Sequence, residues 1–370
     1  MRDGTHIDRF RWTHLQIPFK VRFRHASADR AETSSVWVEA VSDGGTIGVG
    51  ESCPRPYVTG ETIEGARAFL SRHDAGLRAE VGDLSSLTAW MAAHAAEIDR
   101  NPAAWCAVEL AILDLVARER GLTVEALLAL PPLGGTFRYS AVLGDASPEA
   151  FRASANQYRQ YGFSDFKVKL SGDLTRDRDK IDALRGLDID ALRLRADANN
   201  LWDRADDAVA FLRALDYPFF AIEEPLLPNQ YAGLQRVGEA LDCRIILDES
   251  LVRADQLASL PGDPERWIVN LRVSKMGGLL RSLTVVRAAR AAGIDLVVGA
   301  QVGETSLLTR AALIVAGAAG GRLVAQEGAF GDFLLERDVT DPPLMFGAGG
   351  VLDASTYPSL AMPGFGLACA

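Results

Sequence analysis

Histidine is scarce in this chain and absent from most of it. The sequence of 370 residues contains five histidines, and none of them lies beyond His94. A Ser-His-Asp arrangement or a histidine-rich zinc site is therefore excluded from the C-terminal two-thirds of the chain. Any chemistry in that part has to use carboxylates, lysine, arginine, tyrosine or the backbone.

Cysteine is also scarce, and its spacing excludes two further classes of site. No two cysteines have CxxC spacing, so neither a zinc ribbon nor a disulfide framework is indicated. The four are Cys53, Cys106, Cys243 and Cys369. The sequence has no uncharged apolar run of about 18 residues, and its first residues lack the apolar core of a secretory signal. We therefore expect a cytoplasmic protein with no membrane partner.

Basic residues are outnumbered by acidic ones. Lys plus Arg is 39 and Asp plus Glu is 49, which gives a net charge of −10. This excess argues against nucleic acid as a partner. Apolar residues make up 48% of the chain, so there is ample material for buried cores. The length suggests two domains, or one large barrel with an attachment.

Residues 1–130 have the pattern of an α+β domain. Short apolar runs around an Asp43-Gly44-Gly45 turn predict strands, and apolar or amphipathic stretches after them predict helices. The predicted strands are residues 17–23, 35–40 and 46–50, and the predicted helices are residues 63–72, 84–99 and 102–120. Strands followed by helices are typical of an α+β domain.

Residues 131–340 contain a repeat of short strand-like runs, most of them followed by a helical stretch. The runs are residues 139–143, 166–170, 192–197, 219–223, 244–248, 268–273, 296–300 and 323–326. They recur about every 24 to 30 residues, the length of one βα unit, and eight such units close a barrel. An open doubly wound sheet is the alternative. We predict an α/β fold, a (β/α)8-type barrel, with the Gly- and Pro-rich residues 341–370 packing back on the first domain.

Three carboxylates stand at the ends of consecutive predicted strands. Asp197, Glu223 and Asp248 follow the third, fourth and fifth runs at nearly equal spacing. Active sites of such barrels lie at the carboxyl ends of the strands, so we expect these side chains to converge. A set of hard oxygen ligands without His or Cys suits Mg²⁺ or Mn²⁺ rather than zinc. For any one of these acids, capping a helix or pairing with an arginine is the alternative.

Two lysines lie on the second predicted strand. Lys167 and Lys169 are two residues apart in Phe-Lys-Val-Lys-Leu, so they share a face of the strand. Neighbouring ammonium groups lower each other's pKa, which would supply the neutral amine that a general base requires. Lysines on a solvated edge strand are the alternative, but a barrel strand has no solvent face.

These motifs, taken in order, resemble those of the enolase superfamily, in its muconate lactonizing enzyme-like subgroup. The motifs are KVK, DANNLW, IEEP, LDES and VNLRVSKMGG. The resemblance covers nearly the whole chain, since residues 1–130 are similar to that family's capping domain. It implies that Asp197, Glu223 and Asp248 bind Mg²⁺ (or Mn²⁺), that Lys169 is the base and that Lys167 is its electrostatic partner.

The sequence departs from the subgroup on the sixth strand. The subgroup has Asn-x-Lys-x-x-Lys there, whereas this chain has Arg272 at the first lysine position and Lys275 at the second. Arginine does not deprotonate in proteins, so Arg272 cannot be a second base, although it can bind a carboxylate or a developing anion. We include both residues among the catalytic candidates.

Weaker signals mark candidate substrate contacts. Glu304 follows the seventh strand and Glu327 ends the eighth; a helix-capping acid is an equally good interpretation of Glu304. The remaining candidates are Asn199 in the barrel and His25, Arg55 and Tyr57 in the capping domain. The resemblance implies that capping-domain loops close over the site and select the substrate, and loop solvation is the alternative.

The leading hypothesis is a Mg²⁺-dependent enzyme that removes the proton α to a carboxylate through an enediolate. A single-base isomerisation like that of a muconate cycloisomerase comes first. A dehydratase or an o-succinylbenzoate synthase-like lyase is the next alternative, and a two-base epimerase of amino acids or dipeptides ranks lower because of Arg272. A non-catalytic acid-binding barrel ranks last, since a binder needs no base. We expect a small carboxylate substrate and a homo-oligomer.

Overall fold

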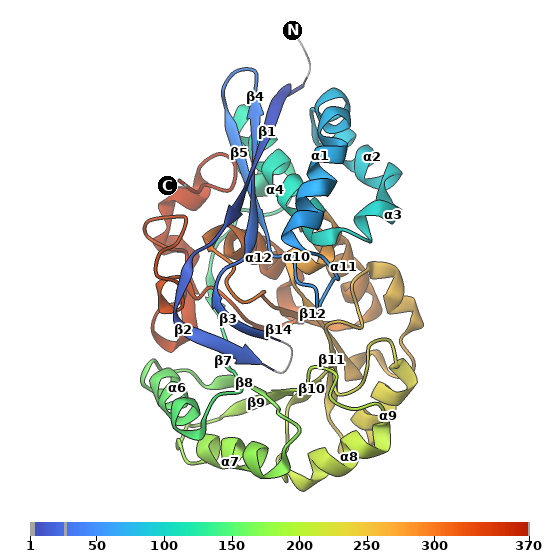
Figure 1. Ribbon diagram of the computed structural model, residues 1–370, viewed down its shortest axis with the longest axis vertical. Coiled ribbons are helices and arrows are strands. Elements are labelled where there is room, and N and C mark those ends of the chain that lie inside the picture. The colour runs from blue at the N-terminus through green and yellow to red at the C-terminus, as the bar shows by residue number, and fades with distance from the viewer. Residues whose placement is uncertain (1–3, 26–27, 369–370) are drawn as a thin grey trace.

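The structure, a computed structural model, describes residues 4–25 and 28–368, and the side chains of residues 23–29 are outside this description. An N-terminal antiparallel sheet with helices stands on an eight-stranded parallel sheet ringed by helices (Figure 1). The predicted fold class, an α/β barrel with a capping domain, is confirmed.

The capping domain is built on the sheet β1-β4-β5. Its strands are β1 (Ile7–Leu15), β4 (Ser35–Ser42) and β5 (Ile47–Ser52), and the predicted turn joins the last two. A separate ribbon of β2 (Pro18–His25) and β3 (Ala28–Glu32) reaches toward the barrel (Figure 1). The sequence prediction missed β1, although Phe10 and Trp12 alternate there with polar residues.

The capping domain also contains helices that follow β5 in the chain. They are α1 (Ile63–Glu80), α2 (Leu84–Ala93), α3 (Ala95–Ile98), α4 (Pro102–Glu119) and α5 (Val124–Leu127). Helices α1 and α4 pack against the sheet β1-β4-β5. The predicted helix 84–99 is interrupted at His94. Helix α4 is buried from Pro102 to Ala117, and β5 lies so close to it that a Cβ on Gly50 would come within 1.9 Å of the Ala107 carbonyl oxygen. Glycine at this position therefore permits the close contact of strand and helix.

Eight parallel strands, β7 to β14, pair in chain order. They are β7 (Ala141–Leu143), β8 (Asp165–Lys169), β9 (Arg193–Asp197), β10 (Ala221–Glu223), β11 (Arg244–Leu247), β12 (Trp267–Leu271), β13 (Asp295–Val298) and β14 (Leu323–Gln326). The first and last strands approach each other where the Ser140 N–H donates to the Gln326 carbonyl at 2.7 Å. Eight units were predicted, and each matches one of these strands.

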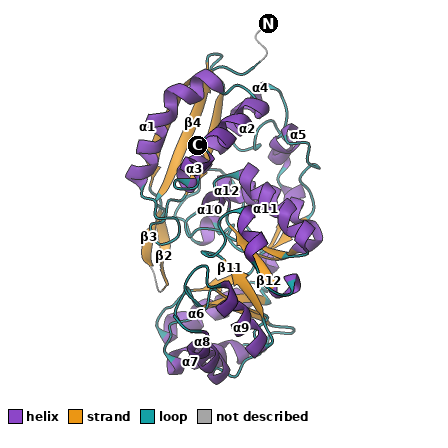
Figure 2. Cartoon of the chain, turned by 90° about the vertical axis from the view of Figure 1, so that its right-hand side faces the viewer, coloured by secondary structure: helices purple, strands orange, loops and turns teal. Residues whose placement is uncertain are grey.

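Helices surround the parallel strands (Figure 2). They are α6 (Pro148–Gln160), α7 (Leu174–Arg185), α8 (Ala205–Ala214), α9 (Tyr231–Leu241), α10 (Val273–Met276), α11 (Leu279–Ala292) and α12 (Ser306–Ala319), and the 3-10 helix Ala254–Ser259 follows β11. Val168, between the two lysines of β8, is fully buried in the hydrophobic core. No helix within the described ranges is long and apolar enough to cross a membrane.

The C-terminal tail contacts both parts of the molecule. Strand β15 (Val351–Asp353) pairs antiparallel with β6 (Thr136–Arg138) beside the barrel. Farther along, Asp114 of α4 accepts a hydrogen bond from the Phe365 N–H at 2.7 Å, and Arg118 donates to the Leu367 carbonyl at 3.0 Å. Cys369 lies outside the described residues, and the other three cysteines are free and buried.

Candidate active site

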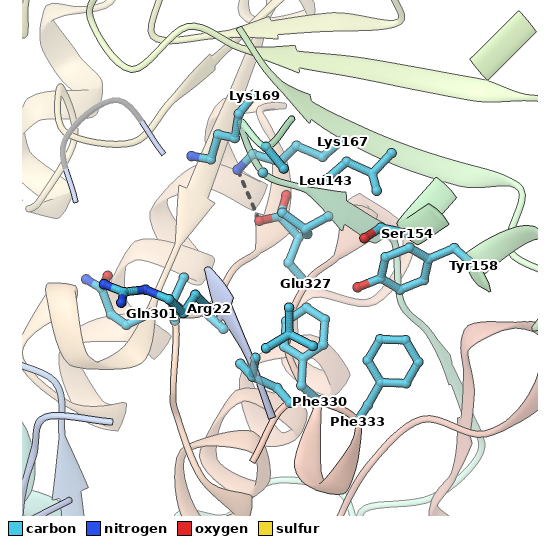
Figure 3. Close-up of a pocket in the computed structure, with 18 of the residues that line it drawn as sticks. Arg22, Leu143, Ser154, Tyr158, Lys167, Lys169, Gln301, Glu327, Phe330 and Phe333 are labelled. Carbon is cyan, nitrogen blue, oxygen red and sulfur yellow. Dashed lines mark hydrogen bonds and ion pairs between the residues drawn. The ribbon is translucent and has the colours of Figure 1, made fainter. Parts of the chain in front are cut away.

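A cavity of about 260 Å³ opens at the carboxyl ends of the barrel strands (Figure 3). Strand ends and the loops after them supply its polar side, whereas α6 and the segment after β14 supply an apolar side. The polar side chains lining it from the barrel include Lys167, Lys169, Asn199, Glu249, Arg272 and Glu327. The position is the one predicted for a barrel active site.

Lys167 and Lys169 lie on one face of β8, as their spacing predicts. The Lys169 ammonium donates to Asp197 Oδ2 at 2.5 Å and to Asn199 Oδ1 at 2.9 Å. Lys167 Nζ lies 3.0 Å from Asp197, 2.8 Å from Glu223 and 3.1 Å from Glu327. Lys167 therefore sits among three carboxylates, while Lys169 stands nearer to the cavity opening at 7% exposure.

The expected mutual lowering of the lysine pKa values is not seen at Lys167. Burial lowers the pKa of its ammonium, but the charges of Asp197, Glu223 and Glu327 raise it more, so the pKa lies above its ordinary value. The three carboxylates lie within ion-pair distance of Lys167, so they raise its pKa by more than the neighbouring ammonium of Lys169 could lower it. Lys167 is accordingly a fixed positive charge in this arrangement.

The three predicted metal ligands are fully buried at adjoining strand ends. Asp197 and Glu223 are paired in register, and Asp248 directly follows β11. Among the described residues, no group of three acidic, histidine or cysteine side chains has the spacing of a metal-ligand set. Each of the three carboxylates faces a nearby cation: Asp248, for example, pairs with Arg272 and with Lys275 at 2.9 Å.

The chemistry of these side chains nevertheless fits a hard divalent cation. Burial, and then the charge of Asp197, raises the pKa of Glu223 to about 7, so a cation bound beside this carboxylate would stabilise its charged form. Asp197 and Asp248 have lowered pKa values; burial raises them, but lysine and arginine charges lower them more. Three buried carboxylates would supply the anionic oxygens that Mg²⁺ prefers.

Arg272 lies directly after β12 and reaches the cavity. One guanidinium nitrogen pairs with Asp248 and lies 3.9 Å from Glu223, and the other donates to Gln301 Oε1 at 3.1 Å. A planar, permanently charged group is thereby held at the edge of the cavity by fixed partners. Such a group can bind an anion but cannot accept a proton.

Lys275, the other catalytic candidate after the sixth strand, does not line the cavity. It lies in the short helix α10 rather than on the strand, and its fully buried ammonium donates to three backbone carbonyls and to Asp248. Lys275 therefore positions Asp248.

The weaker candidates divide into two groups. Tyr57 and Glu327 line the cavity. Arg55 does not, since its buried guanidinium donates to the carbonyls of residues 34, 54 and 302. Glu304 does not either; it accepts the Gln301 N–H at 2.7 Å, and burial raises its pKa to about 8. The side chain of His25 lies outside the described residues.

Two site residues were missed by sequence reasoning. Glu249 follows Asp248 in the LDES motif and lines the cavity, and its Oε2 has no hydrogen-bond partner among the described residues. Arg195 is fully buried and holds Glu327 at 3.0 Å. Its position two residues before Asp197 on the same strand face could have indicated it.

Comparison with known proteins identifies the family. A family model for the enolase C-terminal domain-like fold matches residues 150–369. The chain belongs to this family. It is therefore a member of the enolase superfamily, in the mandelate racemase/muconate lactonizing enzyme family, as the resemblance of its motifs indicated.

Similar proteins of this superfamily include several epimerases. The L-Ala-D/L-Glu epimerase of Bacillus subtilis is 28% identical over 98% of this chain and 96% of its own length. Its substrate-liganded structure superposes with a TM-score of 0.84 over 99% of both chains. A muconate lactonizing enzyme from Mycobacterium smegmatis, complexed with muconolactone, is 26% identical with a TM-score of 0.82, covering 99% of this chain and 97% of that one.

The reaction class agrees with these relatives in broad terms. A dipeptide epimerase of Enterococcus faecalis, similar in fold with a TM-score of 0.80 and 24% identity over 98% of this chain and 99% of that one, was solved with Mg and a dipeptide. The prediction of an enzyme of the isomerase class is confirmed. The leading hypothesis of a cycloisomerase is less well supported than its epimerase alternative, because most of the similar curated enzymes are epimerases.

Proposed function

We propose that this enzyme removes the proton α to the carboxylate of a dipeptide or an N-acylated amino acid, with Lys169 as the base and Mg²⁺ (or Mn²⁺) as the cofactor. The observation that supports this most is the placement of Lys169 at the cavity wall, where its ammonium contacts the buried carboxylate of Asp197. Epimerisation is the first candidate for the overall reaction, and the similar enzymes support it.

The remaining side chains would assist the same step. Asp197, Glu223 and Asp248 would hold the cation, which when bound stabilises the second negative charge that proton removal places on the substrate's carboxylate oxygens. Lys167 would keep a fixed positive charge next to that developing anion. Asn199 accepts a hydrogen bond from Lys169 and so would orient the base toward the substrate.

Arg272 favours a second candidate, a reaction with a single base. Epimerisation needs a proton donor on the opposite face of the α-carbon, and a guanidinium is too weak an acid to give up its proton at neutral pH. With Arg272 at the cavity edge, the enzyme could instead return or use the proton on one face only, as in a cycloisomerase or a lyase. Arg272 would then stabilise the enediolate.

Exchange of the α-hydrogen in D₂O separates these candidates. Proton NMR would follow both epimers of N-acylated amino acids and dipeptides with the Mg²⁺-loaded enzyme. Loss of the α-proton signal from both epimers supports epimerisation, and loss from one epimer alone supports the single-base reaction. If neither epimer of any such substrate exchanges, the proposed proton removal is wrong.

A further inference from the structure

The end of the cavity away from the lysines has a different chemical character. It is walled by α6, by the end of β7 and by the segment that includes the 3-10 helix Gly331–Phe333 (Figure 3). The apolar side chains of this wall are Val142, Leu143, Phe151, Phe330, Phe333 and Leu334. We refer to this part of the cavity as the α6 pocket.

The α6 pocket is held in shape by its own aromatic contacts. The rings of Tyr158 and Phe333 stack with their centroids 5.3 Å apart, and Phe333 also packs against Phe346 at 5.5 Å. Figure 3 shows two polar groups near these rings, the hydroxyls of Ser154 and Tyr158. The pocket is therefore an apolar surface with hydrogen-bonding capacity but no charge of its own.

The charges of the cavity are gathered at the other end. Among the described residues, the carboxylates that line the cavity are Glu249 and Glu327. Glu327 is bound by both Lys167 and Arg195, at 3.1 and 3.0 Å. Glu249 follows β11, across the barrel from α6. An ammonium group in the α6 pocket would lose its water without meeting a carboxylate, which is strongly unfavourable.

We propose that the α6 pocket binds an uncharged, largely apolar arm of the substrate. This inference rests on the proposed function and narrows it: the substrate is an N-acylated amino acid or a similar acid whose arm in the α6 pocket has no ammonium group. The hydroxyls of Ser154 and Tyr158 can hydrogen-bond an uncharged carbonyl or amide in this arm. A dipeptide whose free amino group enters the pocket would be disfavoured.

Three ligands of equal size test the proposal. N-isobutyryl-L-norleucine has no cation in either arm. L-alanyl-L-norleucine replaces a methyl group of its acyl arm by ammonium, and N-isobutyryl-L-ornithine replaces the terminal methyl group of its side chain. Calorimetric titration of the Mg²⁺-loaded enzyme should show that at least one cationic ligand binds about tenfold or more weakly than the neutral one.

A carboxylate introduced into the α6 pocket tests whether this pocket causes the weaker binding of a cationic ligand. Ser154→Asp places a carboxylate on the cavity face of α6, and Ala153→Asp places one on the exposed face of the same helix as a control. Ser154→Asp should reduce the ratio of the Kd of the disfavoured cationic ligand to the Kd of the neutral ligand about tenfold. The control should leave this ratio unchanged.

Two results would overturn the inference. The first is that native enzyme binds both cationic ligands as tightly as the neutral ligand. The second is that the Ser154→Asp variant, shown to be folded by thermal unfolding, has the same ratio of cationic to neutral Kd values as native enzyme. If that variant does not fold, the titration of native enzyme with the three ligands alone decides whether the inference holds. Hydrogen exchange on the same ligands separates the two proposals: binding as expected without exchange would remove the proposed function but leave this inference standing.

Discussion

Buried carboxylates lie in two regions of this molecule and face different partners in each. At the strand ends, Asp197 and Asp248 face lysine and arginine side chains, and these lower their pKa values against the effect of burial. At the seam between capping domain and barrel, Glu51 and Glu109 are equally buried but accept hydrogen bonds from backbone N–H groups, a hydroxyl and an indole. Burial there raises both pKa values to about 7.

The difference shows that burial alone does not assign a carboxylate its role. Cations at the strand ends keep Asp197 and Asp248 charged, which suits binding of a metal and stabilisation of an anion. Neutral donors at the seam hold Glu51 and Glu109 against the first turns of α12 and α11, so these acids join the two domains. The first region would support chemistry and the second would support the assembly of the fold.

The largest effect is expected from removing one strand-end charge. Asp248→Asn leaves too few anionic oxygens for a cation that dehydrates reluctantly. Native enzyme at a Mg²⁺ concentration of about 100 times its Kd should gain about 2.7 kcal/mol of stability, and the variant should gain none. Thermal unfolding with and without Mg²⁺ measures this. Asp203→Asn, at an exposed position, is the control, and an unchanged metal affinity in Asp248→Asn would place the site elsewhere.

Arg272 is the next test of the charged region. Arg272→Ala removes one preorganised donor for a developing anion and should lower turnover by about 10² to 10³-fold. Arg272→Lys restores a positive charge and adds a group that can exchange a proton. Slow exchange of the second epimer should therefore appear in Arg272→Lys if the native enzyme uses one base. Native turnover in Arg272→Ala would show that the guanidinium has no part in the reaction.

A smaller, pH-dependent effect on the free energy of unfolding is expected from Glu51 at the seam. Since the pKa of Glu51 is raised from 4.5 to about 7, the folded state holds a proton that the unfolded state releases between these values. The contribution of Glu51 to the free energy of unfolding should thus be fully present below pH 4.5 and be lost as the pH rises through about 7. Glu51→Gln keeps hydrogen-bonding atoms but not the titration, so it should be about 1 to 3 kcal/mol more stable than native protein at pH 8 and nearly equal at pH 5.

Urea unfolding at pH 5 and pH 8 measures this difference. Glu80→Gln, at an exposed position of α1, is the matched control and should change neither value. If Glu51→Gln keeps the native pH dependence, the titration belongs to another group. A loss of stability in Glu51→Gln at both pH values would mean that the carboxylate is bound in its charged form.

The barrel and its strand-end residues could be predicted from the sequence because a repeating βα unit fixes where each strand ends. Asp197, Glu223 and Lys169 are therefore found where their spacing places them. Lys275 could not be placed, because it lies in the short helix α10, which follows β12 at once. Contacts between distant segments, such as Arg195 with Glu327 and Glu51 with Thr305, have no local signal in the sequence.

The most direct test of the account compares one residue from each region. Lys169→Met keeps an apolar stem but has no base, and Glu51→Gln changes the seam alone. Exchange of the substrate's α-hydrogen with D₂O, measured by proton NMR at pH 7 in both folded, Mg²⁺-loaded variants, should stop in Lys169→Met and continue at the native rate in Glu51→Gln. Exchange that continues in Lys169→Met, or stops in Glu51→Gln, would contradict the assignment of chemistry to the strand ends.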